Sequence, residues 1–235
     1  MSRRAIIVIK TALHLVCLAP FAVLLRQYTS GQLALNPDPI AFITHYTGDW
    51  AVWMLLLSLA VTPVRRISPR IAWLIRLRRI LGLYAFFYAT LHLATYIFLF
   101  SGYDILAAVR GVGAGHPGAI VEQWQQIWPT IWDDVLKRRF IQVGFLAWVV
   151  LLALAVTSPT FVLRAIGGKS WQWLHRLVYV AGFAAIIHYW WLVKPGVTAP
   201  LPVTLVLAVL LVARIGYAVY KRVSRSRPAL EATKI

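Results

Sequence analysis

Cysteine is almost absent from this sequence, and acidic residues are scarce. The 235 residues include one cysteine, Cys17, so the chain cannot form an internal disulfide or a metal site built on paired cysteines. Charged residues make up 13% of the chain, about half of the roughly 25% that is usual in soluble domains. No strand–glycine loop–helix pattern occurs either, which excludes the common nicotinamide-binding fold. The scarcity of charge argues against a soluble domain.

Apolar residues dominate instead, and they gather into six runs. The chain is 60% hydrophobic, with a mean hydropathy of +0.73. Each run has about 17–21 residues, close to the ~20 that a helix needs to cross ~30 Å of hydrocarbon. Because lipid offers no partner for backbone N–H and C=O groups, such runs must be helical. We therefore predict an all-α membrane protein, a six-transmembrane helix bundle that forms one domain over 1–235, with spans at about 5–25, 48–64, 80–100, 140–158, 174–193 and 201–220.

Lysine and arginine, 24 in all against 7 acids, indicate the orientation of the bundle. Six arginines lie between the second and third runs, in RRISPRIAWLIRLRR, and others lie at the N-terminus, after the fourth run and in the tail 221–235. With six spans, all of these fall on one side, which the positive-inside rule makes cytoplasmic. Both termini are then cytoplasmic. The net charge of +17 thus reflects topology and contact with anionic membrane lipid, and nucleic-acid binding is not expected.

The longest connection, about 101–139, is predicted on the opposite side. Its middle, RGVGAGHPGA, is rich in glycine and predicts irregular structure. In the following IVEQWQQIWPTIWDDVLKRR, apolar residues recur at helical spacing, with tryptophans at 124, 128 and 132. This pattern predicts an amphipathic helix in the membrane interface, or alternatively a docking site for a partner. We find no internal repeat in the sequence.

Two histidines lie deep inside predicted spans, where an ionisable side chain is costly and by default marks a functional site. His92 is in the third run and His188 in the fifth, and these two spans point the same way. Counted from the inner edge, the rings lie at depths of ~18 and ~21 Å. Two neutral imidazoles at one depth on separate helices can supply both axial bonds of one b-type haem, an arrangement that favours electron transfer. The alternative is that each histidine only hydrogen-bonds across helices.

The sequence indicates the other histidines less clearly as haem ligands. His175 begins the fifth run, 13 residues before His188, and on a straight helix the two rings would point ~140° apart. The position level with it on the third span is Arg79, which cannot bind iron, so a second haem would need another ligand. His14, ~14 Å into the first span, is one candidate, and a helix-packing hydrogen bond is the alternative. His45 and His116 are expected in outer loops as surface residues.

Basic residues near the inner face offer a possible anion site. Arg76, Arg78, Arg79 and Lys169 could hold a phosphate of a flavin or lipid, or a haem propionate. The plainer interpretation is that they only set the topology. Arg214, well within the sixth run, could snorkel to the interface or pair with a propionate, and the sequence does not decide between these.

Four stretches carry a family resemblance: TALHLVCLAPF, HYTGDWAVWMLLLSLAVTPVRR, RRILGLYAFFYATLHLATY and WQWLHRLVYVAGFAAIIHYWWLVK. They resemble the haem-binding membrane subunits of bacterial periplasmic methionine sulfoxide reductase systems, within the ferric-reductase-like transmembrane family, over nearly all of 5–220. The resemblance implies a multi-pass protein of the bacterial inner membrane with one or two haem b groups and an associated FMN. His92, His175 and His188 match the family's haem-ligand positions, whereas Arg79 stands where the wider group has a fourth histidine.

The resemblance also implies a partner, a periplasmic molybdopterin-containing methionine sulfoxide reductase catalytic subunit that forms a heterodimer with this chain. We therefore predict a non-catalytic electron-transfer subunit of an oxidoreductase complex. Electrons would come from a cytoplasmic flavin reductase that uses NAD(P)H, or from quinol, and would cross the membrane to the partner, which repairs oxidised proteins. The alternative is a haem-free membrane transporter or scaffold subunit. Against a transporter, we expect that no span carries an acid, and no pair of broken spans is evident.

Overall fold

The computed structural model describes residues 2–232, and it describes side chains as far as Ser224. Within this range the chain is helical and contains no strand. The helices are α1 (Arg3–Thr29), α2 (Pro39–Val64), α3 (Arg78–Thr95), α4 (Ile105–Gly113), α5 (Ala119–Lys137), α6 (Arg139–Val156), α7 (Thr160–Ile166), α8 (Gly168–His175), α9 (Val178–Leu192) and α10 (Leu201–Ala232). Short 3-10 turns at Gln32–Leu35 and Pro69–Arg76 flank α2, and a π-helical turn, Tyr96–Phe100, extends α3.

Five of these helices are long and apolar enough to cross a membrane: α1, α2, α3 with its π-helical turn, α6 and α10. The chain is therefore a multi-pass membrane protein with an all-helical fold. The predicted fifth span, 174–193, is divided in the structure, because α8 ends at His175 and α9 begins at Val178. Tight turns from Arg176 to Trp173 and from Leu177 to Leu174 break the helix there. α9 has 15 residues, fewer than the ~20 of a typical span.

The second helix begins nine residues before the predicted span. Asp38 caps its N-terminus by accepting a hydrogen bond from the backbone N–H of Ala41 at 2.9 Å, and Pro39 occupies the first turn. As a consequence His45, expected in a loop, lies on α2 as an exposed residue. Asp49, expected near the end of a span, becomes the eleventh residue of a 26-residue helix.

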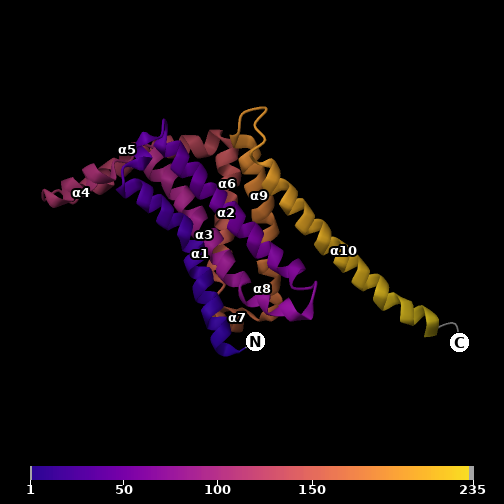
Figure 1. The fold of residues 1–235 in the computed structure, drawn as a ribbon. Coiled ribbons are helices and arrows are strands. Elements are labelled where there is room, and N and C mark those ends of the chain that lie inside the picture. The colour runs from indigo at the N-terminus through magenta and orange to yellow at the C-terminus, as the bar shows by residue number, and fades with distance from the viewer. Residues whose placement is uncertain (1, 233–235) are drawn as a thin grey trace.

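The core of the bundle lies where α2, α3, α6 and α9 pack together (Figure 1). Ala85 on α3 and Ala181 on α9 are completely buried, which allows the backbones to approach closely. The first helix is held by Tyr88, whose hydroxyl donates to the Cys17 carbonyl at 2.7 Å and accepts from the Phe21 N–H at 3.2 Å. Tyr88 thereby bridges α1 at Pro20, where proline interrupts the helical hydrogen bonding.

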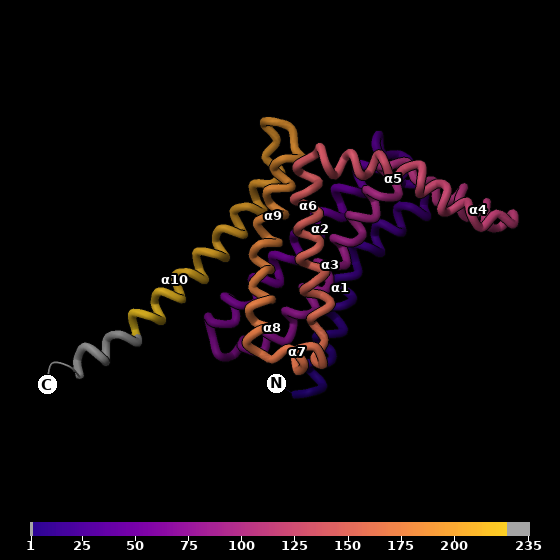
Figure 2. Tube along the Cα trace, turned by 180° about the vertical axis from the view of Figure 1, so that it is seen from behind, coloured from indigo at the N-terminus to yellow at the C-terminus, as the bar shows by residue number. Residues whose placement is uncertain are grey.

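Two helices extend sideways from one end of the bundle. α4 and α5 form an arm that projects away from the other helices, as both views show (Figures 1 and 2). The expectation of irregular structure in the glycine-rich stretch, 110–119, is wrong for its first four residues, which belong to α4, whereas a short turn follows Gly113 and separates α4 from α5. The predicted amphipathic helix is present as α5, with the rings of Trp124, Trp128 and Trp132 following one another at 5.7 and 6.0 Å.

The last helix leaves the bundle obliquely and ends near the level of α7 and α8, where α1 also begins (Figure 1). Trp190 on α9 donates to Thr204 on α10 at 2.9 Å, close to the start of the last helix. Further along, Arg214 reaches back to the bundle and donates to the Leu59 carbonyl on α2 at 2.5 Å. The basic tail predicted at 221–235 lies largely beyond the described side chains.

Candidate functional site

His92 and His188, predicted at matching depths, face each other in the structure. Their ring centroids are 5.9 Å apart, and the ring planes cross at 83°. His92 comes from α3 and His188 from α9, so each ring is carried by a helix rather than a loop. Helices hold a binding geometry more firmly than loops do.

Each ring is oriented by a backbone carbonyl of a neighbouring helix. The Nδ1 atom of His92 lies 2.9 Å from the Thr44 carbonyl oxygen on α2, and Nδ1 of His188 lies 2.7 Å from the Phe140 carbonyl oxygen on α6. A carbonyl oxygen can only accept a hydrogen bond, so each Nδ1 must carry the proton. The Nε2 atom of each neutral ring then has a lone pair free to bind a metal.

Two glycines make room for these rings. A Cβ atom at Gly48 on α2 would lie 3.1 Å from Nδ1 of His92, and one at Gly144 on α6 would lie 2.6 Å from Nδ1 of His188. Real Cβ atoms essentially never come within 3.0 Å of a neighbouring atom, so alanine at Gly144 would displace the ring. The glycines therefore allow both imidazoles to reach the carbonyls.

The two halves of the site repeat one another along the chain. The two carbonyls, at Thr44 and Phe140, are 96 positions apart in the sequence. The same separation holds for the two glycines, at 48 and 144, and for the two histidines, at 92 and 188. The completely buried Ala85 and Ala181 have the same separation. The sequence analysis found no internal repeat, because this correspondence consists of a few spaced positions in helices that are apolar throughout.

The paired rings fit two ligands of one metal ion. Metal–imidazole bonds are about 2.0–2.1 Å, as for zinc, and the ring centre lies roughly 1.1 Å beyond the nitrogen, so two imidazoles that share one metal ion have ring centres at most about 6 Å apart. The observed 5.9 Å agrees with this value. No group of three or more histidine, cysteine or acidic residues that could hold a metal ion without a prosthetic group occurs among the described residues. The arrangement thus suits a metal whose remaining ligands come from a macrocycle such as haem.

His175 lies apart from this pair, at the end of α8. Its Nε2 atom is 3.3 Å from the Thr157 hydroxyl, and the Trp171 ring stacks on it at 3.8 Å. Thr157 already donates its proton to the Ala153 carbonyl at 2.6 Å, so the hydroxyl accepts from Nε2 of His175. To bind a metal through Nε2, the ring would have to release Thr157.

The remaining histidines have other partners. Nδ1 of His14 lies 3.0 Å from the Tyr84 hydroxyl on α3, which is the helix-packing hydrogen bond considered as the alternative for this residue. His116 pairs with Glu122 at 3.0 Å on the exposed arm. Neither contact places these rings beside His92, His188 or His175.

The predicted anion-binding residues differ in exposure. Arg76, Arg79 and Lys169 are exposed, and of the four only Arg78 is partly enclosed by the bundle. Arg78 instead lies within electrostatic range of Arg65 and Arg214. Sequence reasoning missed Arg65 because it stands in a run of arginines that topology already explains.

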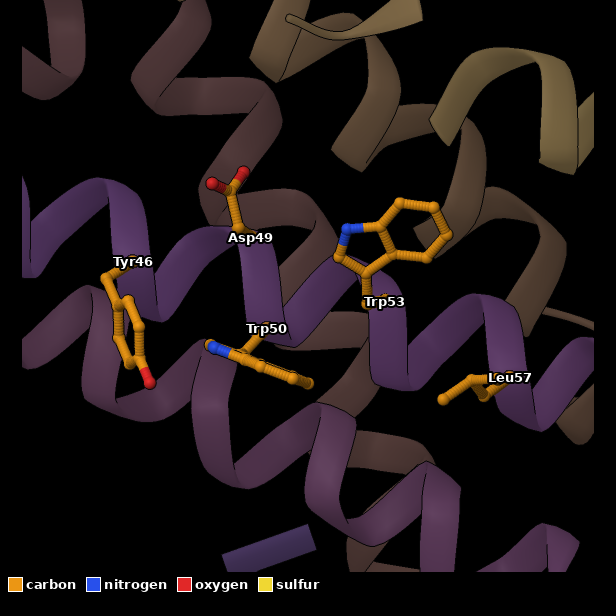
Figure 3. Close-up of a pocket in the computed structure, with 5 residues that line it drawn as sticks. All are labelled: Tyr46, Asp49, Trp50, Trp53 and Leu57. Atoms are coloured by element: carbon orange, nitrogen blue, oxygen red, sulfur yellow. The ribbon is translucent and has the colours of Figure 1, made fainter. Parts of the chain in front are cut away.

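An acidic residue inside α2 was also missed. Asp49 directly follows Gly48, and its carboxylate interacts with the hydroxyl of Tyr189, the residue after His188. It borders a groove of about 450 Å³ that Tyr46, Trp50, Trp53 and Leu57 complete along α2 (Figure 3). In Figure 3 the Asp49 carboxylate projects away from the Trp50 ring. The expectation that no span has an acid in its interior is therefore wrong.

The fold and the site together define a class: a multi-pass helical membrane protein with two partly buried, carbonyl-anchored imidazoles facing each other between helices. Residues 47–186 match the model of the family described as ferric reductase like transmembrane component, and the chain belongs to this family. The resemblance noted in the sequence is thus confirmed.

Curated relatives match nearly the whole chain. One is the protein-methionine-sulfoxide reductase heme-binding subunit MsrQ of Herminiimonas arsenicoxydans, 42% identical over 216 residues, which are 91% of this chain and 87% of the relative. Another is the MsrQ subunit of Xanthomonas oryzae pv. oryzae (strain MAFF 311018), 41% identical over 227 residues, 95% of this chain and 91% of the relative.

Proposed function

We propose that this chain is a b-type haem subunit that carries electrons across the bacterial inner membrane to a periplasmic methionine sulfoxide reductase. The observation that carries the proposal is the pair of imidazoles on α3 and α9, with ring centroids 5.9 Å apart and both Nδ1 atoms anchored to carbonyls. The relatives that match over most of the chain are named as heme-binding subunits of protein-methionine-sulfoxide reductases, which supports the same function.

In this proposal His92 and His188 bind the iron through their Nε2 atoms. Haem held by these two residues would supply one-electron redox chemistry. The chain's own residues orient the ligands and exclude water. The Thr44 and Phe140 carbonyls fix the tautomers, and the completely buried Ala85 and Ala181 keep the helices close.

The proposed topology has six crossings, with α9 as the fifth and both termini in the cytoplasm. α9 runs alongside α6 and is at least as apolar, and α8 adds length on its cytoplasmic side. The arm formed by α4 and α5 would then lie on the periplasmic face. We propose that it contacts the interface and the molybdopterin-containing catalytic subunit, with which the chain forms a heterodimer.

Electrons enter, in our proposal, from the cytoplasmic side through FMN and a flavin reductase, or from quinol in the bilayer. By family resemblance His175 would bind a second haem near that side, and it must first release Thr157. The position 96 residues before His175 is Arg79, so the repeat that pairs His92 with His188 gives His175 no partner.

The rival function is a haem-free transporter or scaffold subunit, and Asp49 within α2 removes one argument against a transporter. The decisive test is reconstitution of the purified protein in liposomes. A reducible b-type visible spectrum, with electrons passing from an internal flavin reductant to an external acceptor, is expected. A colourless protein, or one that passes no electrons, would favour the rival.

A further inference from the structure

The arm formed by α4 and α5 joins a membrane span at each end. α5 ends at Lys137 and α6 begins at Arg139, so Arg138 alone separates the arm from that span. α6 has 18 residues, which rise about 27 Å at ~1.5 Å per residue, so nearly the whole helix is needed to cross ~30 Å of hydrocarbon. The corner at Arg138 therefore lies at the membrane surface. At the other end, residues 101–104 separate the π-helical turn of α3 from α4, so this end of the arm also starts near the surface.

The direction of the arm keeps it near that surface. Seen from opposite sides, the arm runs across the direction of α6 and α9 and extends beyond the bundle (Figures 1 and 2). A helix that begins where a span leaves the bilayer, and then runs across the spans, lies along the plane of the membrane. The arm is therefore placed where an amphipathic helix can bind a lipid surface.

Contacts at the corner hold α5 in this direction. The Tyr96 hydroxyl, in the π-helical turn of α3, donates to the Asp134 carboxylate at 2.9 Å, and Asp134 also pairs with Arg138 at 2.8 Å. From α6, the Gln142 side chain donates to two carbonyls in the last turn of α5, at 2.9 and 3.0 Å. The base of the arm is thus tied to two spans, and the bundle sets the orientation of α5.

α5 has three distinct faces. The first is at least partly buried and contains Trp124, Ile127 and Ile131. The second is apolar yet uncovered. Its four residues are spaced seven, four and four positions apart, which keeps them on one side at 3.6 residues per turn, and their exposed fractions are 45–58%: Val121, Trp128, Trp132 and Leu136. We call these four residues the apolar stripe.

The third face of α5 is polar, and its acids have partners within the arm. Glu122, Gln126, Asp133 and Lys137 recur on this face and are exposed. Lys137 pairs with Asp133 at 2.8 Å, and Glu122 pairs with His116 at 3.0 Å. This face therefore offers no concentrated positive charge to anionic lipid headgroups. Membrane binding by α5 must come from the apolar stripe.

We propose that the α4–α5 arm is an interfacial anchor, in which the apolar stripe inserts into the bilayer surface while the polar face of α5 remains in water. Tryptophan is enriched at membrane–water interfaces, and an amphipathic helix buries its apolar face ~5–10 Å deep at the boundary between headgroups and acyl chains. α4 adds exposed apolar residues at Ile105, Leu106 and Val109. The ligand of the stripe is thus lipid, held by apolar area and not by headgroup charge.

The anchor decides a point that the proposed function leaves open. If lipid covers the stripe, a periplasmic catalytic subunit can meet only the polar face of α5, and this consequence rests on the proposed function. The anchor itself requires only that the helices cross a membrane, so it does not depend on haem.

The test measures depth in the bilayer with nitroxide labels on the full chain in phosphatidylcholine liposomes. Trp128→Cys and Trp132→Cys carry labels on the stripe, and the matched controls Gln126→Cys and Thr130→Cys carry them on the exposed polar side of the same helix. Leu146→Cys, on the exposed surface of the α6 span, is the lipid reference. Electron paramagnetic resonance then compares how often each label collides with oxygen, which concentrates in lipid, and with a water-soluble nickel chelate.

The ratio of oxygen to nickel collisions should be roughly tenfold higher on the stripe than at the controls, and it should approach that of the lipid reference. Adding phosphatidylglycerol to the liposomes should not change it, because the polar face of α5 has no concentrated positive charge. If Trp128→Cys does not fold, Val121→Cys places a label on the same stripe.

Three results would overturn the proposal. Stripe labels that collide with nickel as often as the controls would place the arm in water. Stripe labels shielded from both reagents would show that protein, such as a second copy of this chain, covers the stripe. A ratio that rises only with phosphatidylglycerol would contradict anchoring by apolar area. The haem spectrum is recorded separately, so a colourless protein with lipid-exposed stripe labels would contradict the proposed function and leave the anchor standing.

Discussion

The imidazole of His92 faces that of His188 across the boundary between α3 and α9, with the ring centroids 5.9 Å apart. The relationship depends on backbone atoms, since each ring donates through Nδ1 to a carbonyl on the adjacent helix. Both histidines are therefore oriented by the backbone of the bundle, which lowers the cost of ordering the site. The four helices α2, α3, α6 and α9 act as one frame.

Alanine at Gly144 should disrupt the site more than alanine at Gly48. The new Cβ would lie 2.6 Å from Nδ1 of His188, against 3.1 Å from Nδ1 of His92. Overpacking of this kind costs about 1–3 kcal/mol, which corresponds to roughly 5–150-fold weaker haem binding. We expect lower haem per chain in Gly144→Ala, measured by the pyridine haemochrome absorbance against protein concentration, and a smaller loss in Gly48→Ala.

Gly182→Ala is the matched control for these variants. Gly182 lies on α9, and a Cβ there would make only ordinary contacts of 3.7–3.9 Å with Leu207 and Leu59. Its haem content should equal that of the unaltered protein. Equal losses in all three variants would show that helix packing in general, and not the space beside the imidazoles, explains the effect.

Cysteine labelling should count the crossings. Cys17 is 1% exposed, so single cysteines introduced elsewhere can be labelled against a low background. With six crossings, a membrane-impermeant maleimide should label Ser30→Cys and Thr198→Cys in intact spheroplasts. Lys169→Cys and Ser224→Cys should react only after permeabilisation. If α9 does not cross, the results for Thr198→Cys and Ser224→Cys would be exchanged.

Tyr88→Phe should destabilise the protein without affecting the iron ligands. The substitution removes a buried hydroxyl that bonds to Cys17 and Phe21 across the proline break in α1. We expect a loss of about 1–3 kcal/mol and a lower Tm in detergent, because the two hydrogen bonds that fasten α1 to α3 would be lost. Tyr103→Phe, whose exposed hydroxyl reaches Ile120 only at 3.4 Å, should leave Tm nearly unchanged. A similar Tm for both variants would contradict this account of how α1 is held.

Much of the fold could be predicted from hydropathy alone, because lipid forces apolar runs to be helical. The start of α6 at Arg139 agrees within one residue with the predicted span, and α10 starts at Leu201 as predicted. The boundaries that differ have local causes. Asp38 and Pro39 start α2 early, and two tight turns after Trp173 and Leu174 separate α8 from α9. Hydropathy contains no information on capping or on such turns.

The site was only partly predictable. Depth counting placed His92 and His188 at one level, because helical rise is constant. The carbonyl partners at Thr44 and Phe140 could not be found this way, since any residue can supply a carbonyl and only the rotation of neighbouring helices selects one. The sequence contained one weak indication of the site. Gly48 and Gly144 both lie inside apolar helices, and each precedes by 44 positions the histidine that it contacts.

Iron content should also separate the roles of the other histidines. His14 forms a hydrogen bond with the Tyr84 hydroxyl and His175 with the Thr157 hydroxyl. His92 and His188 are instead oriented by backbone carbonyls. We expect His14→Ala to retain all its iron. If the chain holds two haems, His175→Ala should lose one and retain the visible signal of the other. Loss of all haem in His14→Ala would contradict the assignment of His14 to helix packing.

The central claim is tested most directly by the visible spectrum and iron content of His92→Ala and His188→Ala, each purified beside His116→Ala, which alters an exposed histidine of the arm. The account predicts that either central substitution abolishes the b-type signal of the paired site, whereas His116→Ala keeps it in full. Full haem content in both central variants would show that these two imidazoles do not hold the iron.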